Sequence, residues 1–190
     1  MKKFALLGCG ALLIVGLGLL FVGVGTYNGL IRIDERVNKE WAEIDNMLQR
    51  RADLIPNLVE TVKGYAAHEK EVFQAVADAR SRLIGAQGVT DKAAASGALD
   101  SALSRLLAIA ERYPELKADT NFLRLQDELA GTENRIAVAR TRYNEAVEIF
   151  NAQIKRIPGV FFAGFMGLEK RPYFEIKNEQ ARNVPAVSFR

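Results

Sequence analysis

The sequence has few of the residues that most often build catalytic and metal sites. It has one histidine and one cysteine among 190 residues. One cysteine cannot form an intramolecular disulfide, and one histidine with one cysteine cannot form a His/Cys cluster for a transition metal. The spacings GxSxG, HExxH, GxGxxG and GxxxxGK[ST] do not occur. We therefore expect a protein that is not an enzyme, with no cofactor and no metal.

The chain also lacks an excess of charge of one sign. Apart from Lys2 and Lys3 at the start, 24 basic residues stand against 23 acidic residues. A nucleic-acid-binding surface requires a basic patch or stripe, and none emerges from this balance. The sequence predicts no nucleic-acid partner.

A long apolar run is present near the N-terminus. Residues 4–25, FALLGCGALLIVGLGLLFVGVG, contain no charge. As a helix they would measure about 33 Å, enough to cross a bilayer core of roughly 30 Å. A secretory signal peptide would have a shorter apolar region and a small-x-small cleavage site. We therefore expect residues 1–26 to be an uncleaved membrane anchor. The letters LLGC at 6–9 resemble a lipoprotein box, but too few apolar residues precede Cys9 for lipidation to be favoured.

Basic residues flank the anchor on both sides. Lys2 and Lys3 favour a cytoplasmic N-terminus by the positive-inside rule. Arg32, Arg36 and Lys39 on the other side make the comparison nearly even, although they lie further from the apolar run. The sequence thus predicts a single-pass membrane protein with its main domain outside the cytoplasm.

Apolar residues at sevenfold spacing predict an all-α bundle after residue 27. Between residues 30 and 83 one row consists of Leu30, Val37, Ile44, Leu58, Tyr65, Val72 and Ala79, and a second of Trp41, Leu48, Ile55, Val62, Val76 and Leu83. The last long helix carries Phe122, Leu129, Ile136, Tyr143, Phe150 and Ile157. Such rows are typical of amphipathic helices that pack together.

Pro56 leaves the number of helices open. If it only kinks the first helix, residues 28–84 form one rod and the bundle has three helices. If the chain reverses near 52–56, helices at about 28–51, 56–84, 92–113 and 119–157 form an antiparallel up-and-down four-helix bundle. Asp53 could cap a helix that begins at Leu54. An even number of passes would return the apolar residues 160–168 to the membrane, so we favour four helices.

Breaker residues mark the remaining boundaries. GAQGVTD at 85–91 predicts a turn, with Thr90 or Asp91 as the cap of the next helix. Pro114 is expected to end that helix at Tyr113, and Pro158-Gly159 to end the last one. The expected domains are an anchor at 1–26, a bundle at 27–158, and an irregular tail at 159–190 that is first apolar and then polar.

Residues 50–71, RRADLIPNLVETVKGYAAHEKE, concentrate polar groups and include His68. The chain has no second histidine, and Glu60, eight residues before His68, would share its helix face without touching it, so a solvated or capped helix face is favoured over catalysis there. Arg51, Glu69, Glu133 and Arg140 differ, because they fall at core positions of the heptad rows. A buried charge is costly unless it is paired. We expect a structural network in which Arg51 or Arg140 faces Glu133 or Glu69; side chains that reach solvent and a binding site are the alternatives.

Two further groups of residues suggest contact with lipid or with other helices. Phe161, Phe162, Phe165 and Met166 are expected to insert at the membrane interface, with Lys170 and Arg171 at the headgroups. In the anchor, small residues repeat every seven positions, at Cys9, Gly16 and Gly23 and at Ala11, Gly18 and Gly25. Small residues permit close helix approach in lipid, so this stripe predicts a homo-oligomer. The alternative is that glycine is simply common in membrane helices.

Three segments in order resemble the LemA family. They are residues 25–80, GTYNGL to VADAR, residues 116–158, LKADTNF to KRIP, and RPYFE at 171–175. The resemblance implies a bacterial membrane protein with an N-terminal anchor and a helical bundle, and no established enzyme activity. Members include a protein needed for magnetosome formation, and some are encoded beside membrane proteases. Several relatives carry a lipobox cysteine before the YN pair, where this chain has Gly25-Thr26 and cannot be lipidated by that route.

The expected function is that of a non-enzymatic, membrane-anchored helical scaffold or adaptor of the cell envelope. The expected partners are the lipid bilayer, further copies of the chain and a membrane protein such as a membrane protease. One alternative is a membrane-remodelling protein that acts through its apolar tail. Another is a hydrolase of envelope substrates.

Overall fold

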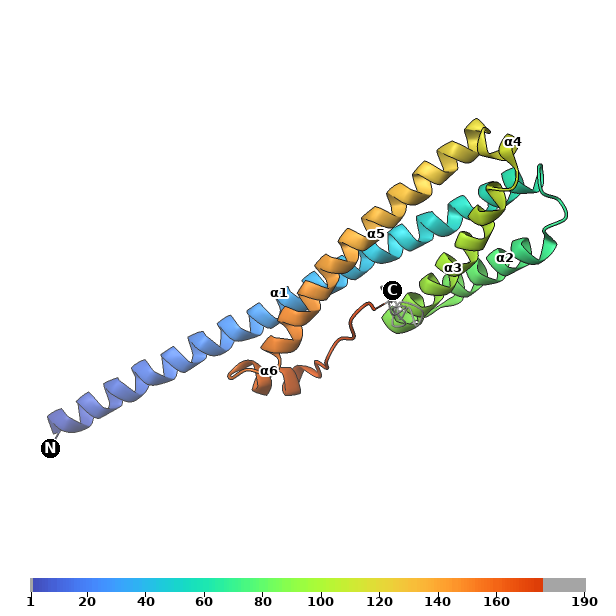
Figure 1. The fold of residues 1–190 in the computed structure, drawn as a ribbon. Helices are drawn as coiled ribbons and strands as arrows, with labels where there is room; N and C mark the ends of the chain where they lie inside the picture. Colours follow the sequence, from blue (N-terminus) through green and yellow to red (C-terminus); the bar gives the residue numbers. More distant parts are fainter. Residues whose placement is uncertain (1, 176–190) are drawn as a thin grey trace, which may run out of the picture. The chain divides into compact units, whose positions relative to one another are not determined.

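The computed structural model describes residues 2–175, and it describes side chains for residues 13, 14 and 16–175. All regular structure in that range is helical (Figure 1). The helices are α1 (Lys2–Lys63), α2 (Lys70–Gly85), α3 (Gly88–Ala110), α4 (Pro114–Lys117), α5 (Thr120–Gln153) and α6 (Gly159–Met166). The all-α fold predicted from the sequence is confirmed.

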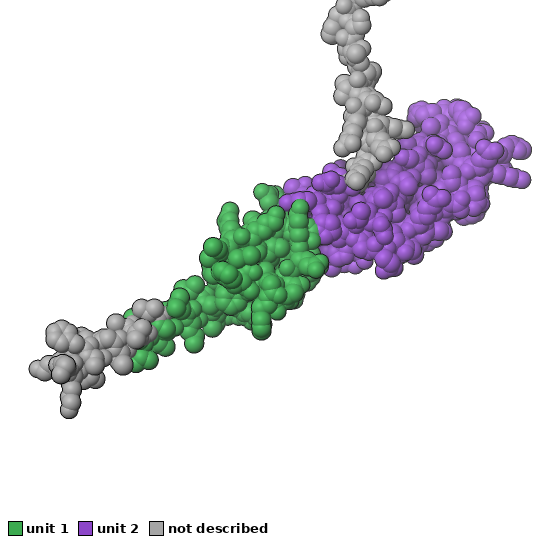
Figure 2. Space-filling view, turned by 90° about the horizontal axis from the view of Figure 1, so that it is seen from below, with its two compact units in different colours: residues 1–39, 145–171 green, residues 40–144, 172–190 purple. Residues whose placement is uncertain are grey.

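The chain forms two compact units, which Figure 2 colours separately. Unit 1 contains residues 1–39 and 145–171, and unit 2 contains residues 40–144 and 172–190. Unit 2 holds four long helical segments, from α1, α2, α3 and α5, and successive segments run in opposite directions in Figure 1. The number of helices and their up-and-down order therefore agree with the favoured four-helix form.

The first reversal lies elsewhere than predicted. The sequence places it at 52–56, whereas α1 continues through Pro56 to Lys63 and the chain turns at 64–69. The two heptad rows explain the longer helix, because Leu58 of the first row and Ile55 and Val62 of the second are all buried. Asp53 consequently lies inside α1 and bonds to Gln49 on the same helix face, so it caps no helix.

Pro56 is accommodated by an exchange of hydrogen-bond donors. A proline has no N–H, so the carbonyl four residues earlier loses its helical partner. That carbonyl belongs to Ala52, which is fully buried. The Nε of Arg80 on α2 donates to this oxygen over 2.7 Å. The proline thus leaves the Ala52 carbonyl of α1 free to accept a hydrogen bond from Arg80 of α2.

Gly88 shapes the turn between α2 and α3. Gly88 has φ +73° and opens α3, so Thr90 and Asp91 lie in its first turn instead of capping it. α3 ends at Ala110, three residues before the predicted end at Tyr113, and Pro114 begins the short α4.

The sequence predicts an irregular C-terminal tail. Its start instead forms the helix α6. A side chain at Gly159 would collide with the Gln153 carbonyl, so the turn from α5 into α6 requires glycine. At the other end Gly167 has φ +65°, and the Leu168 amide donates to the Ala163 carbonyl over 2.9 Å. This is the bonding of a left-handed glycine cap.

The predicted apolar rows form the interior of each unit. The buried apolar side chains of unit 1 include Leu30, Val37, Val147, Phe150 and Ile154. Those of unit 2 include Ile44, Leu48, Leu58, Leu99, Leu106, Phe122, Ile136 and Tyr143. Two row members are exceptions: Tyr65 follows α1 and is 38% exposed, and Ile157 follows α5 and is 79% exposed.

Candidate functional sites

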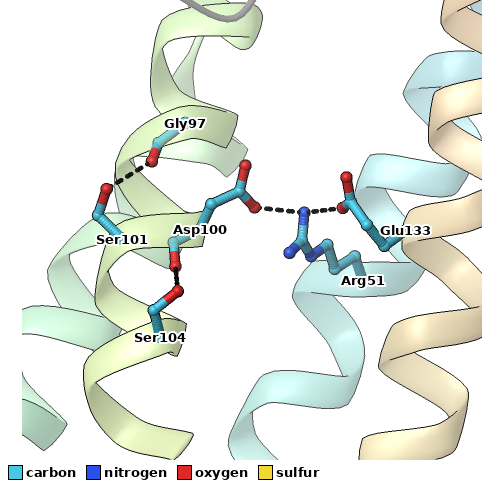
Figure 3. A network of polar contacts seen from close by, with 6 residues as sticks. All are labelled: Arg51, Gly97, Asp100, Ser101, Ser104 and Glu133. Atoms are coloured by element: carbon cyan, nitrogen blue, oxygen red, sulfur yellow. Dashed lines mark hydrogen bonds and ion pairs between the residues drawn. The ribbon is translucent and has the colours of Figure 1, made fainter. Parts of the chain in front are cut away.

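Arg51 lies at the centre of a charged cluster in unit 2 (Figure 3). The residue is 7% exposed and projects from α1 between α3 and α5. Its Nη1 atom lies 2.6 Å from Asp100 Oδ1 on α3 and 2.6 Å from Glu133 Oε2 on α5. One buried cation therefore joins three helices.

The cluster carries more negative than positive charge. Two carboxylates share one guanidinium nitrogen, while the buried Nε of Arg51 has no hydrogen-bond partner in the described structure. The contact with Glu133 is a hydrogen bond, whereas that with Asp100 is an ion pair without hydrogen-bond alignment. The Asp100 and Glu133 side chains are 32% and 44% exposed, so water reaches both acids. This geometry holds helices together more readily than it activates a nucleophile.

The structure bears on each of the four predicted network residues. Arg51 faces Glu133, as expected. Glu69 instead pairs with Arg112, with 2.7 Å between Oε1 and Nη2, and Arg140 is half-buried with no ion pair within residues 2–175. The predicted involvement of Glu69 and Arg140 was wrong, and Asp100 was missed. Its only sequence signal is its place beside the buried Leu99 on an amphipathic helix.

A cavity of about 530 Å³ lies next to the cluster. Leu103, Leu107, Leu129 and Ala130 give it an apolar wall, and Arg51, Asp100, Ser104, Gln126, Asp127 and Glu133 line the remainder. Among the described residues no three His, Cys, Asp or Glu side chains converge as metal ligands would. Ser104 supplies the one hydroxyl of this lining, and it donates to the Asp100 carbonyl over 2.8 Å.

The polar stretch 50–71 does not converge on one place. Glu60 pairs with Lys63 over 2.8 Å, and His68 lies exposed in the loop between α1 and α2. Tyr65 donates from its hydroxyl to Asp119 over 2.9 Å. Asp119 also accepts from the Phe122 amide over 2.9 Å and so caps the start of α5. Tyr65 and Asp119 thus join the loop after α1 to the start of α5.

The Tyr65–Asp119 contact shifts the pKa of both side chains. The Phe122 amide, and then the Tyr65 hydroxyl, hold the pKa of Asp119 below its ordinary value, because they favour the carboxylate. The bond to Asp119, and the negative charge of that residue, raise the pKa of Tyr65.

In unit 1, Asn151 binds the backbone of the tail. Its Oδ1 accepts from the Arg171 amide over 2.9 Å and its Nδ2 donates to the Arg171 carbonyl over 3.0 Å. The Arg171 guanidinium lies 2.9 Å from Asp34 and over the ring of Phe150 at 5.9 Å. The charge of Arg171 is therefore paired within the unit, and its place at lipid headgroups stays a prediction.

In unit 2, Asn144 binds the tail in the same way. Its side-chain amide accepts from the Phe174 N–H over 2.9 Å and donates to the Phe174 carbonyl over 3.3 Å. Tyr143 donates to the Pro172 carbonyl over 2.9 Å, and the fully buried Phe174 ring lies 6.1 Å from that of Trp41. The RPYFE motif is thus held largely through its backbone. The only sequence signal of these tail contacts is that Asn144 and Asn151 lie seven residues apart on α5.

The apolar tail residues lie on α6 in unit 1. Phe161 and Phe165 are 70% and 89% exposed, while Phe162 and Met166 are half-buried. A Cβ added to Gly23 of α1 would lie 3.4 Å from the Phe162 ring, so α6 packs on the N-terminal helix. Of the small-residue stripe, Gly23 is therefore covered by this chain. At Gly16, Gly18 and Gly25 no described atom beyond the neighbouring residues and backbone of the same helix lies within 4 Å of an added Cβ. The side chains of Cys9 and Ala11 lie outside the described part.

The chain was compared with known proteins. The model of the LemA family matches residues 40–189. This chain belongs to the LemA family. The match begins at Glu40, so residues 25–39 of the first resembling segment lie outside it.

Individual relatives agree with this family assignment. The LemA family chain is 27% identical over 188 residues to magnetosome protein MamQ 2 of Paramagnetospirillum magneticum, covering 85% of this chain and 68% of that protein. Magnetosome protein MamQ of Magnetospirillum gryphiswaldense matches with the same identity and coverage. Protein LemA of Metamycoplasma hominis is 27% identical over 135 residues, covering 70% of this chain and 62% of that protein.

One described helix is long and apolar enough to cross a membrane, within Gly16–Lys63 of α1. Its apolar part exposes Leu17, Leu19, Leu20 and Phe21. With the family membership, this helix indicates a membrane-associated protein of the cell envelope.

Proposed function

We propose that this LemA family member is a membrane-anchored scaffold or adaptor without catalytic activity, in the bacterial inner membrane. One observation carries the proposal: α1 contains both the apolar segment and, without a break in the helix, the residues that begin the bundle. Among the described residues, Arg51 is the most buried charged one, and it joins three helices of that bundle. Such a link favours a stable bundle on which partners can bind. The bundle lies outside the cytoplasm, and its partners are other copies of the chain and a membrane protein, such as a membrane protease.

In-cell photo-crosslinking tests the scaffold role. A photoreactive residue at Val138, 51% exposed on α5, is expected to give discrete adducts with a membrane protein. The same residue at Ile136, 1% exposed, is the matched control and should give none. Absence of adducts from every exposed position of α2, α3 and α5 would exclude the adaptor role. Release of soluble fragments from isolated envelopes by the purified protein would instead favour the hydrolase alternative.

Exposed phenylalanines on α6 favour membrane remodelling as a second candidate. Liposomes imaged with and without the purified protein distinguish the two functions. A scaffold leaves vesicle shape unchanged. A remodelling protein makes tubules, and Phe161→Ser with Phe165→Ser should then abolish them.

A further inference from the structure

α6 exposes the most apolar surface of the described tail. Ile157, Val160, Phe161 and Phe165 are 79%, 42%, 70% and 89% exposed. The sequence between residues 157 and 168 contains no charge. Apolar side chains exposed in this number are typical of an interaction surface, so we expect an apolar partner for α6.

The place of α6 within unit 1 identifies that partner. Phe162 packs at Gly23, which belongs to the uncharged run 4–25 of α1. Neighbouring residues of that run, Leu20, Phe21 and Val24, are themselves 65%, 81% and 52% exposed. The exposed faces of both helices are thus apolar at the same level. If α1 spans a bilayer, α6 lies beside the same lipid.

We propose that α6 inserts into the bilayer interface beside the anchor, with phospholipid acyl chains covering Phe161 and Phe165. This inference rests on the proposed function, because it takes α1 as a membrane anchor. The eight residues of α6 measure about 12 Å and cannot cross a core of roughly 30 Å. α6 is therefore an interfacial helix and not a second span.

The contact with Gly23 also sets the depth. Gly23 is two residues from Gly25, where the apolar run ends and Thr26, Tyr27 and Asn28 follow, and this is about 3 Å along the helix axis. Lys155 and Arg156 before α6 and Lys170 after it are exposed and can reach headgroups. α6 thus lies at the edge of the hydrocarbon region, whereas Leu13 lies near the middle of the run.

Depth-dependent fluorescence quenching tests this arrangement in the full chain. The sequence has one tryptophan, Trp41, so Trp41→Phe gives a dark background. On it, Phe165→Trp reports α6, Leu13→Trp reports the anchor, and Val138→Trp reports the bundle. Each variant is reconstituted into phosphatidylcholine vesicles with bromine on the acyl chains, either near the headgroup or near the chain end. We expect headgroup-proximal bromine to quench Phe165→Trp by about half, chain-end bromine to quench Leu13→Trp more, and neither to quench Val138→Trp.

Each outcome separates this inference from the proposed anchoring. A quenched Leu13→Trp with an unquenched Phe165→Trp would overturn the insertion of α6 and leave the anchor intact. If neither is quenched, anchoring itself fails.

A second variant tests the depth-setting contact. Gly23→Leu displaces Phe162 and should lower the quenching of Phe165→Trp, whereas Gly25→Leu, with open space around it, should not. Equal quenching in both would show that Gly23 does not position α6.

Discussion

At the residue scale, the Arg51 cluster predicts strongly non-additive losses of stability. Asp100→Ala or Glu133→Ala alone should lower the free energy of unfolding by about 1 kcal/mol, because the other, partly exposed carboxylate still pairs with Arg51. The double variant should lose about 3–5 kcal/mol, because it leaves a buried, unpaired charge. Urea unfolding of the protein in detergent measures all three.

Glu60→Ala is the matched control, since Glu60 pairs with Lys63 on the surface of α1 and should change stability by less than about 0.5 kcal/mol. A double variant that loses only the sum of the two single losses would show that Arg51 finds water once both acids are gone.

Asp119 predicts a pH dependence at the start of α5. Its lowered pKa means that the folded state favours the carboxylate. Its contribution is therefore fully present above the ordinary Asp pKa of about 3.9 and is lost as pH falls through the lower folded value. Thermal unfolding of wild type and Asp119→Asn should differ most near neutral pH, and the difference should shrink in acid. In a Tyr65→Phe background, Asp119→Asn should still show most of this pH-dependent difference, because the Phe122 amide is the larger cause of the lowered Asp119 pKa. A constant difference at all acidic pH values would contradict the assignment.

Part of the Arg51 cluster could be predicted because it follows from periodicity. Arg51 and Glu133 stand at core heptad positions, where an unpaired charge is costly, and they face each other. Asp100 could not be predicted in the same way, because it lies at the edge of the apolar face of α3. The tail contacts were missed because Asn144 and Asn151 bind backbone groups, and a sequence pattern carries no information on which distant backbone groups are left without partners.

At the element scale, Pro56 and Arg80 predict a coupled pair. Arg80→Ala leaves the buried Ala52 carbonyl without a partner and should cost about 1–3 kcal/mol. In a Pro56→Ala background, the backbone amide gained at position 56 can donate to the same carbonyl, so Arg80→Ala should cost clearly less there. A double-mutant cycle by urea unfolding measures the difference, which we expect to exceed about 1 kcal/mol. Equal costs in both backgrounds would show that Arg80 does not compensate for the proline.

This exchange also explains why the first reversal was placed wrongly. A proline inside a helix costs about 3 kcal/mol in isolation, which favoured a turn near residue 56. Burial of Ile55, Leu58 and Val62, together with the Arg80 contact, outweighs that cost. Local propensity at Pro56 was visible in the sequence, whereas the donor that offsets it comes from a different helix.

At the scale of the whole molecule, the anchor stripe separates into two functions. Gly23 contacts Phe162 of the same chain, whereas Gly16 and Gly18 face open space in the single chain. Close approach of a second helix requires small residues whose surface is free. Any interface between copies of the chain should therefore use Gly16 and Gly18, and Gly23 should serve the position of α6.

Leucine substitution tests this separation. Gly16→Leu with Gly18→Leu should disperse the proposed homo-oligomer, because larger side chains prevent backbone contact between helices in lipid. Gly23→Leu should displace α6 and leave the assembly intact, and Leu13→Ala, at an exposed position of the same helix, is the control. Sedimentation of each variant in detergent measures its size. If the Gly16/Gly18 variant sediments as wild type does, these glycines face lipid and the chain does not assemble through its anchor. If Gly23→Leu alone disperses the assembly, Phe162 does not occupy that surface, and the packing of α6 on α1 is a contact that a second copy replaces.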